Sequence, residues 1–411
     1  MSLSKHAFML GLSMLTILVL CISCSSATIQ HESNAVHDLE AEDEFVSCEL
    51  NMDLAWTLNT ESSLEYVSSL STRGDILIAV STYSDQIIAI DIPTGTVLWQ
   101  YHYPGYIYSY LPPSSTSLHI CTADSVYSTD ISTGDVTSLG PYALCDYDDL
   151  DIWTQGAYIV DGINLRFLTA GTTVGGVVCS SLLVGATPHG EVDFIAPGRL
   201  TCPPVVVGSK LYMGTGQGWV ECTSGRLHIL DLNTLSEITR RKFDDPVQEI
   251  VIEGEYLYVL TAQDYMYSYA GTIHAIDMVT GRDLWSLSGI FGDSSPLLLD
   301  DVILLGLCDE YPIQGGVVAL DRATGARRWQ YSIKSSLVRP TFLVTNGEHI
   351  FFGEKGLDGG VYTESGHIHA LDHNGNEVWV YEANGPIHQV SLSDTGYLIA
   401  ACGGGEILCF K

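Results

Sequence analysis

Basic residues are scarce in this sequence. Its 411 residues include 17 lysines and arginines against 49 aspartates and glutamates, which gives a formal net charge of −32 at pH 7. Such a surface repels the phosphates of DNA and RNA, so nucleic acids are excluded as partners. The carboxylates are scattered along the whole chain rather than collected in a tail. They predict a solvated acidic surface and identify no substrate.

Charged residues of both signs make up only 16% of the chain, against 46% hydrophobic residues. A chain of this length and composition can bury a large core, which excludes an intrinsically disordered protein. One apolar run is long: residues 6–23, HAFMLGLSMLTILVLCIS, follow Lys5 and precede small residues. This is the layout of a secretory signal, and the run is slightly shorter than the ~20 residues that a spanning helix needs. We therefore predict export, with residues 1–27 as the signal.

Two ways of processing this segment stay open, with an uncleaved anchor as a third. Cys24 lies in the sequence CISCSS, which resembles a lipoprotein box and predicts lipidation of Cys24 and attachment to a membrane. In the alternative, cleavage after Ala27 releases a secreted protein. The next segment, 28–44, is polar and acidic and cannot bury enough surface to fold, so we expect a flexible tether. Residues 45–411 are expected to form one domain.

Internal repetition predicts the fold of that domain. Four segments share one template: AIDIPTGTVLW, AIDMVTGRDLW, ALDRATGARRW and ALDHNGNEVW. Each is expected to be a strand, a tight turn and a second strand, in which the aspartate carboxylate caps the turn and the glycine supplies a positive φ. The tryptophan is expected to pack between neighbouring repeats. The residues with these structural roles are Trp56, Asp91, Gly95, Trp99, Asp277, Gly281, Trp285, Asp321, Gly325, Trp329, Asp372, Gly375 and Trp379.

Weaker copies fill the gaps between the four, and together they predict a β-propeller, an all-β fold of four-stranded blades. A final strand that ends at Lys411 has no tryptophan strand after it, whereas Trp56 has no aspartate strand before it. We predict that these two ends pair to complete an eighth blade, which would remove two open sheet edges. Seven blades are the alternative. The aspartate position recurs at intervals of 39 to 51 residues, at Asp91, Asp130, Ser181, Asp231, Asp277, Asp321 and Asp372.

The template A-[IL]-D-x-x-[TN]-G-x-x-x-W resembles the pyrroloquinoline-quinone-like (PQQ-like) repeat over roughly residues 51–411. This family includes quinoprotein alcohol dehydrogenases and the outer-membrane assembly lipoprotein of Gram-negative bacteria. The quinone-dependent enzymes carry a vicinal Cys-Cys disulfide over the cofactor and a calcium ion beneath it, and this sequence has no Cys-Cys pair. The resemblance therefore implies a non-enzymatic propeller without a cofactor. A PQQ- and calcium-dependent oxidoreductase of reduced size is the alternative.

Neither the histidines nor the acidic clusters predict a metal centre. His228, His274 and His369 each precede a marker aspartate by three residues, but equivalent positions in separate blades lie too far apart to bind one metal ion. We expect packed histidines. The segment DYDDLD has carboxylates at calcium-like spacing but lacks the glycine and terminal glutamate of a calcium loop, so a solvated loop is the preferred interpretation. Its carboxylates are Asp146, Asp148, Asp149 and Asp151.

The cysteines allow two disulfides in an exported protein. Cys202 and Cys222 are expected at the same end of one blade, so they form the first candidate pair. Cys121 and Cys145 form the second. Both pairings stay open, because a sequence alone does not fix the connectivity.

Four consecutive repeats lengthen the connection that enters the aspartate strand. These connections, TGQGWVECTSG, AQDYMYSYAG, CDEYPIQG and EKGLDGGVYTESG, are expected on one rim of the propeller. Aromatic side chains with acidic neighbours, on loops of a rigid scaffold, are typical of a recognition surface, although packing of the loops on one another is an equally open alternative. We predict that a monomeric protein binds an envelope protein or peptide through this rim. The predicted rim residues are Trp219, Glu221, Asp264, Tyr265, Tyr267, Asp309, Glu310 and Tyr311.

Overall fold

The computed structural model describes much of the chain from residue 50 to residue 411, all within one compact unit, Ser47–Lys411. The stretches that it does not describe are 61–66, 68, 82–83, 106, 112–115, 123–124, 142–150, 161–162, 173–177, 188–189, 198, 218–223, 263–269, 291–294, 309–313, 337 and 357–365. Between 151 and 199 it describes the backbone alone.

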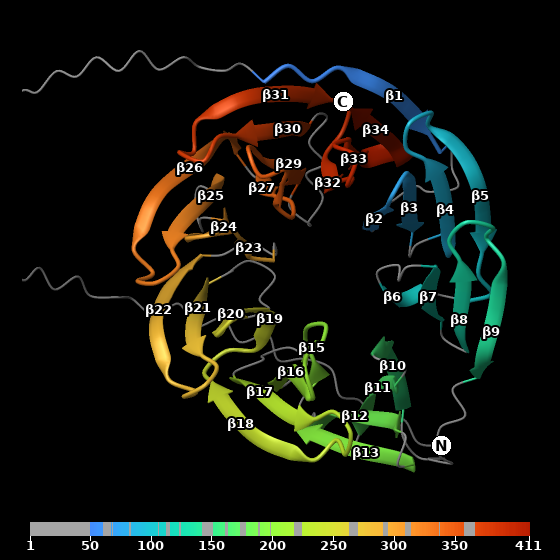
Figure 1. The fold of residues 1–411 in the computed structure, drawn as a ribbon, viewed down its shortest axis with the longest axis vertical. Helices are drawn as coiled ribbons and strands as arrows, with labels where there is room; N and C mark the ends of the chain where they lie inside the picture. The colour runs from blue at the N-terminus through green and yellow to red at the C-terminus, as the bar shows by residue number, and fades with distance from the viewer. Residues whose placement is uncertain are drawn as a thin grey trace, which may run out of the picture. The chain divides into compact units, whose positions relative to one another are not determined.

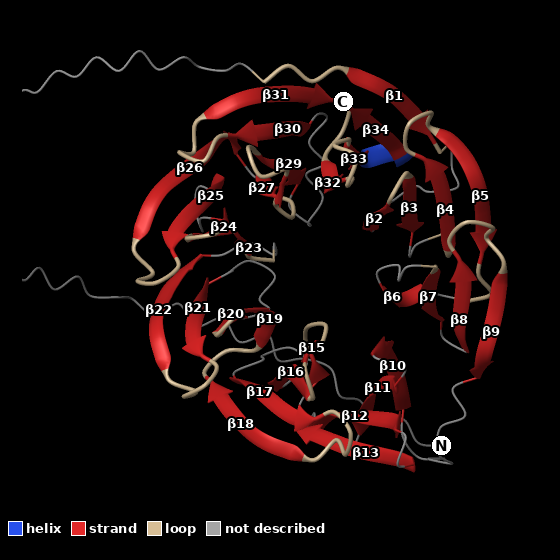
Figure 2. Ribbon diagram, viewed as in Figure 1, coloured by secondary structure: helices blue, strands red, loops and turns tan. Residues whose placement is uncertain are grey.

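Strands account for nearly all of the regular structure in the described residues (Figure 2). They pair antiparallel in eight sheets within this part of the chain, numbered here in chain order. Sheet 1 contains β2 (Ser69–Arg73), β3 (Ile76–Ser81), β4 (Gln86–Asp91) and β5 (Thr96–His102). Sheet 2 contains β6 (Ile107–Leu111), β7 (Ser117–Thr122), β8 (Ser125–Asp130) and β9 (Val136–Pro141). Sheet 3 contains β10 (Asp151–Val160), β11 (Ile163–Thr172), β12 (Val178–Thr187) and β13 (Gly190–Pro197).

Sheets 4 and 7 have a fifth, short strand. Sheet 4 contains β14 (Arg199–Leu200), β15 (Val205–Val207), β16 (Lys210–Gln217), β17 (Ser224–Asp231) and β18 (Glu237–Phe243). Sheet 5 contains β19 (Val247–Glu253), β20 (Tyr256–Ala262), β21 (Ala270–Asp277) and β22 (Asp283–Ile290). Sheet 6 contains β23 (Leu297–Leu298), β24 (Val302–Cys308), β25 (Gln314–Asp321) and β26 (Arg327–Ser336). Sheet 7 contains β27 (Val338–Pro340), β28 (Val344–Thr345), β29 (Ile350–Gly356), β30 (Gly366–Leu371) and β31 (Glu377–Ala383).

Sheet 8 combines strands from two distant parts of the chain. It contains β32 (Ile387–Leu392), β33 (Leu398–Cys402) and β34 (Glu406–Phe410), with the short 3-10 helix η1 (Gly403–Gly405) before β34. Its outer strand is β1 (Leu54–Asn59), which pairs antiparallel with β34 so that Trp56 lies opposite Cys409. The backbones of Asp53 and Lys411 exchange two further hydrogen bonds, of 3.1 and 3.0 Å.

Within this unit the sheets follow one another in chain order around a common centre, with the first strand of each sheet toward the centre and the last outside (Figure 1). Apolar side chains fill the space between successive sheets wherever side chains on both sides are described. One core cluster joins Ile78 of sheet 1 to Ile120 of sheet 2, and another joins Leu260 of sheet 5 to Leu305 of sheet 6. Because a sheet has a neighbour on each side, both of its faces are buried, which explains continuous apolar runs such as ILIAV in β3. The predicted all-β fold of four-stranded antiparallel sheets is confirmed.

The aspartate and the glycine of the template build the turn between the last two strands of a sheet. In sheet 6 a carboxylate oxygen of Asp321 accepts hydrogen bonds from the backbone of Ala323 at 3.1 Å and from that of Thr324 at 2.9 Å. The backbone N–H of Gly325 then donates to the carbonyl of Asp321 at 2.8 Å. This last bond requires a φ of +71° at Gly325, a conformation that a glycine adopts without strain.

Each template tryptophan packs on the turn of the following sheet. The indole Nε1 of Trp56 in sheet 8 donates to the carbonyl of Ile92 in sheet 1 at 2.6 Å. The ring also covers Gly95, where a Cβ would lie 2.7 Å from Trp56, so the turn glycine leaves room for the indole. The same bond joins Trp99 to Ile131, Trp285 to Arg322 and Trp329 to His373. Trp379 instead packs edge-on against Phe410, with ring centroids 5.4 Å apart.

One of the predicted repeat positions was wrong. Ser181 was assigned to the marker at the end of an aspartate strand, but it lies inside β12, opposite Thr169 on one side and Ala196 on the other. The strand continues to Thr187, so the turn comes six residues later than predicted. The error arose because this copy has Thr187 where the strong copies have the aspartate that marks the turn.

Candidate functional site

The four long connections leave from paired strand ends. β16 and β17 pair as far as Gln217 and Ser224, and β20 and β21 pair as far as Ala262 and Gly271. The register of β24 with β25 and of β29 with β30 places the other two connections at corresponding strand ends. We call this end of the sheets the rim side, and the opposite end, which carries the aspartate turns, the turn side.

The residues predicted on the rim lie outside the described part of the chain. The same holds for Cys24, for Cys222 and Cys145, and for Asp146, Asp148 and Asp149. For Cys121 and Asp151 only the backbone is described, in β7 and β10. The rim and the Cys121–Cys145 pairing therefore stay predictions, whereas Cys202 is a buried free thiol and does not form the predicted disulfide with Cys222.

A buried network of carboxylates and histidines lies on the rim side of sheet 7, next to the connection 357–365. Glu354 in β29 is 3% exposed. His367 and His369 stand two residues apart on β30 and so point to the same face of the sheet. Nδ1 of His367 lies 2.7 Å from one oxygen of Glu354, and Nε2 of His369 lies 3.2 Å from the other. Each oxygen of this carboxylate thus binds one imidazole.

His369 also contacts a second carboxylate. Its Nδ1 lies 2.7 Å from Oε1 of Glu377 in β31, and the hydroxyl of Tyr331 in sheet 6 donates to the same oxygen at 2.6 Å. His369 thus lies between the two carboxylates, with one ring nitrogen toward each. Phe352 stacks on its ring at a centroid distance of 4.9 Å.

The acidity of these groups follows from their contacts. Burial would raise the pKa of Glu354, but the hydrogen bonds from His369 and His367 outweigh burial and hold this pKa below its usual value. The pKa of Glu377 is lowered in the same way, by Tyr331 and His369 against burial. Burial and the bond to Glu377 raise the pKa of the Tyr331 hydroxyl. The network is thus charged at neutral pH and satisfied by its own members.

Sheet 4 contains a simpler contact between a histidine and a carboxylate. Nδ1 of the fully buried His228 lies 2.7 Å from Glu237 of the next strand. Thr215 stands where sheet 7 has Glu354, and its hydroxyl lies 3.3 Å from Nε2 of His228. His228 and His369 thus lie in separate sheets and bind carboxylates of their own sheets, whereas the His274 ring packs against Phe243 at a centroid distance of 4.9 Å. Within the described residues no group of three or more histidines, cysteines or carboxylates is arranged to bind a metal ion.

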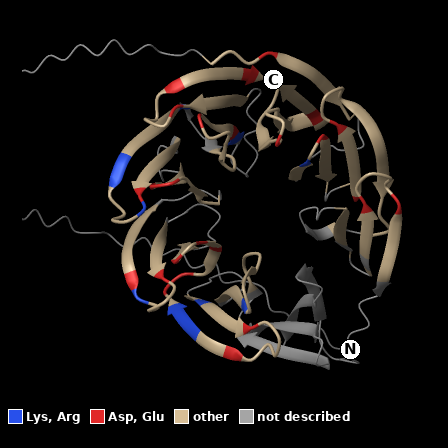
Figure 3. Cartoon of the chain, in the orientation of Figure 1, with Lys and Arg blue, Asp and Glu red and all other residues tan. Residues whose placement is uncertain are grey.

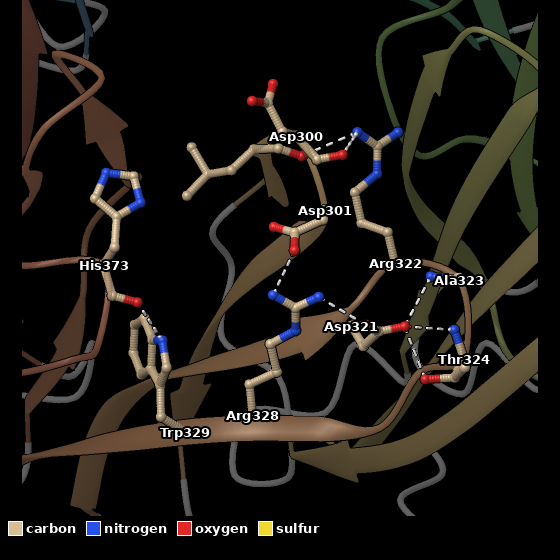
Figure 4. Close-up of polar contacts among 10 residues, drawn as sticks. Asp300, Asp301, Asp321, Arg322, Ala323, Thr324, Arg328, Trp329 and His373 are labelled. Atoms are coloured by element: carbon tan, nitrogen blue, oxygen red, sulfur yellow. Dashed lines mark hydrogen bonds and ion pairs between the residues drawn. The ribbon is translucent and has the colours of Figure 1, made fainter.

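The turn side of sheet 6 carries two arginines that hold neighbouring segments together (Figure 4). Arg328 lies between Asp301 and Asp321, at 2.7 Å from a carboxylate oxygen of each. Its bond to Asp321, together with the bonds from Thr324, lowers the pKa of that carboxyl to about 2. All of these contacts stabilise the turn, so this cluster is structural.

Arg322 extends in the other direction, toward sheet 5. Its guanidinium lies 2.5 Å from a carboxylate oxygen of Glu253 and donates to the hydroxyl of Tyr258 at 3.1 Å. It also donates to the carbonyls of Leu299 and Asp300. With its donors engaged, Arg322 links sheets 5 and 6 and is not free to bind a ligand.

Sheet 5 contains one carboxyl group with strongly changed acidity. Burial raises the pKa of Glu249 in β19 to about 7, against the opposing effect of its hydrogen bond with Ser295 of the segment before β23. Cys202, which is buried and free, has a thiol whose pKa is raised by its burial and by the nearby Glu249. The thiol is therefore unreactive at neutral pH.

Sequence reasoning missed Glu354 and its partners. The repeat template begins in the aspartate strand, and Glu354 lies on the preceding strand, outside the template. A signal was present in the spacing of His367 and His369 in GHIHALD, because alternate residues of a strand share one face.

The family comparison matches nearly the whole described domain. Residues 53–287, 200–339 and 271–410 each match the family model described as "Outer membrane protein assembly factor BamB". The chain belongs to this family. The predicted resemblance to PQQ-like repeat propellers is confirmed. A search of curated proteins found no match.

Solved structures share the fold at low sequence identity. BamB from Moraxella catarrhalis is 19% identical with a TM-score of 0.55, over 88% of this chain and 98% of that one. A europium-containing methanol dehydrogenase is 12% identical with a TM-score of 0.57, over 85% and 84%. Saccharomyces cerevisiae Sqt1 is 10% identical with a TM-score of 0.58, over 88% and 99%. Identities this low establish a propeller fold and leave function open.

The described residues contain no helix that is both long enough and apolar enough to cross a membrane. The apolar run 6–23 lies outside them.

Proposed function

We propose that this protein is an exported, non-enzymatic scaffold that binds an envelope protein or peptide through the rim side of its propeller. Membership of a family named for outer-membrane protein assembly is the observation that carries this proposal. The geometry supports it, because the sheets hold four paired strand ends on one side, and the long connections between them carry aromatic and acidic residues. Loops on a rigid scaffold are where binding residues concentrate.

Three finer features belong to the same proposal. The eight sheets are eight blades, and the pairing of β1 with β34 closes the ring. The protein acts as a monomer and needs no cofactor. It is attached on the extracytoplasmic side of a membrane through a lipid on Cys24.

Crosslinking in cells tests the binding surface. The full chain and a Trp219→Ala/Tyr265→Ala/Tyr311→Ala variant are expressed in Gram-negative cells, and envelope proteins crosslinked to each are quantified. We expect the variant to lose most crosslinking at an unchanged melting temperature, since a few aromatic anchors dominate most interfaces. The matched control replaces exposed aliphatic residues of outer strands, Leu98→Ala and Leu139→Ala.

Fractionation of the same cells tests the anchor. The full chain is expected in the membrane fraction with a lipid-modified Cys24, and a Cys24→Ser variant in the soluble fraction. A rim variant that crosslinks like the unmodified chain would refute the binding surface. A marked fall in its melting temperature would show that the rim aromatics are packing residues.

A further inference from the structure

The turn of sheet 5, Asp277–Gly281, has an uncovered glycine as far as the structure is described. Gly281 has a φ of +69°, as the other turn glycines do, yet no described atom outside the turn lies within 4 Å of the position of its Cβ. At Gly95, Gly134, Gly325 and Gly375 a tryptophan atom lies 2.6 to 2.7 Å from that position. Gly281 is accordingly exposed, whereas those four glycines are partly covered.

The preceding sheet lacks the tryptophan that would cover it. In sheet 5 the template tryptophan, Trp285, lies opposite Ala275, and the corresponding residue of sheet 4, opposite Ile229, is Thr239. Thr239 is exposed and too short to reach the next turn.

The turn of sheet 4 shows how the chain covers a turn without a tryptophan. Leu235 takes the glycine position there, with a φ of +50°, and its own side chain is 1% exposed. A leucine at such a φ is strained, so the burial of its side chain must compensate. The turn of sheet 5 has a glycine, as the tryptophan-covered turns do, but sheet 4 provides no tryptophan to cover it.

The surface around this open position is apolar and lies beside an exposed arginine. Val279, in the turn itself, is 77% exposed. The carbonyl of Met278 corresponds to the carbonyls that accept the indole N–H in the four covered turns. Lysines and arginines are concentrated on the adjacent strand β18 (Figure 3). Arg241 shares the face of Thr239 and pairs with Asp283 of sheet 5 at 2.5 Å, whereas Arg240 and Lys242 lie on the opposite face. The exposed basic residue of the turn itself is Arg282.

We propose that the open turn of sheet 5, formed by Met278, Val279 and Gly281 beside Thr239, binds a tryptophan side chain from an acidic segment of another protein. The chain itself contains four indole–turn contacts of this kind, each with the indole N–H bonded to the carbonyl after the aspartate. The fit of the indole to this backbone is thus built into the fold. Acidic neighbours of the tryptophan match Arg282, the exposed basic residue of the turn.

This site is separate from the rim proposed above, because aspartate turns lie at the opposite ends of the strands. It goes beyond the proposed function and does not depend on it.

Binding of a labelled acidic heptapeptide, Gly-Asp-Glu-Trp-Glu-Asp-Gly, to the full chain tests the proposal by fluorescence anisotropy. A Thr239→Trp variant supplies the indole from within the chain, and we expect it to weaken peptide binding about tenfold or more, as removal of an aromatic anchor does. The same variant should melt at a higher temperature, because the new indole covers the turn. A peptide with alanine in place of tryptophan should bind as weakly. An Arg282→Glu variant should bind the original peptide less tightly, and the difference should shrink at high salt.

A second variant, Gly281→Leu, places a leucine at the turn position that Leu235 occupies in sheet 4, so its side chain should cover the turn. This variant provides the test if Thr239→Trp does not fold. The rim triple variant should bind the peptide as the unmodified chain does, so failure of the rim does not affect this test. Absence of peptide binding to the unmodified chain, or binding that survives both filling variants, would overturn the proposal.

Discussion

Glu354 shows how one residue changes a repeated contact. Sheet 4 pairs a histidine with a carboxylate and places Thr215 beside it, whereas sheet 7 replaces that threonine with a second, buried carboxylate. A buried charge is tolerated only with partners, and Glu354 has two imidazoles. Its position next to the connection 357–365 means that the charge state of this network affects the strand ends that hold the connection.

The pH dependence of stability follows from the lowered pKa of Glu354. A carboxyl whose pKa is lower in the folded than in the unfolded state stabilises the fold above its unfolded pKa, and that contribution is lost as the pH falls through the folded pKa. We expect Glu354→Gln to lower the unfolding free energy by about 2 kcal/mol at pH 7, since a charged hydrogen-bonded partner is removed. The difference from the unmodified chain should begin to shrink as the pH falls below the ordinary glutamate pKa of about 4.3, and should be lost below the folded pKa of Glu354.

Urea unfolding between pH 3 and pH 7 measures this difference. Glu348→Gln is the matched control, because Glu348 is an exposed carboxylate of the loop that precedes β29. A difference between Glu354→Gln and the unmodified chain that stayed constant over the whole range would mean that ionisation of Glu354 does not stabilise sheet 7.

The hairpin between the last two strands is the element that the sequence predicts best. The template assigned a capping aspartate, a glycine of positive φ and a packed tryptophan, and the structure has each of them in the strong copies. Sheet 3 was mispredicted because Thr187 replaces the marker aspartate there, so the marker was placed six residues too early, at Ser181. The open turn of sheet 5 was also missed. This turn is open because sheet 4 has Thr239 in place of the tryptophan, while sheet 5 has the turn glycine Gly281.

Trp285 joins the hairpin of sheet 5 to the turn of sheet 6. Replacing it with phenylalanine keeps an aromatic ring between the sheets but removes the N–H that donates to the carbonyl of Arg322 at 2.8 Å. We expect Trp285→Phe to cost about 1 kcal/mol and Trp285→Ala roughly 3–5 kcal/mol in chemical unfolding, from the hydrogen bond alone and from the lost packing, respectively.

Leu284→Ala is the control, because Leu284 precedes the tryptophan in the same strand and is 45% exposed. Its effect should stay within about 0.5 kcal/mol. Equal effects of Leu284→Ala and Trp285→Ala would show that the indole does not join the two sheets.

At the scale of the molecule, contacts between the first and last sheets complete the set of inter-sheet contacts. The side-chain amide of Gln389 in sheet 8 bonds to both the N–H and the carbonyl of Leu70 in sheet 1, at 2.8 and 3.2 Å. Composition and repeats predicted the all-β fold from the sequence alone. Bulges such as the one at Gln389, which aims a side chain at the next sheet, have no repeat signature and could not be predicted.

Removal of β1 tests whether the pairing of the two ends stabilises the whole ring. Deleting residues 51–58 exposes the edge of β34 and part of the core that Trp56 and Leu58 cover. We expect a loss of roughly 3–5 kcal/mol, measured as a fall in the thermal unfolding midpoint. Deleting the predicted tether, 28–44, is the control and should cost almost nothing. Equal melting temperatures for the two truncations would contradict closure of the ring by these strands.

The pairing of β1 with β34 also sets an order of events during biosynthesis. The hydroxyl of Thr60, just after β1, donates to the carbonyl of Gly405 just before β34, a residue made 345 positions later. While the chain is being made, β1 emerges early and its partner is among the last strands to appear. Sheet 8 can therefore be completed only after the other described strands have been made, and until then a strand edge is open to other chains. During this interval the fold itself does not protect that edge, so other components of the cell must do so.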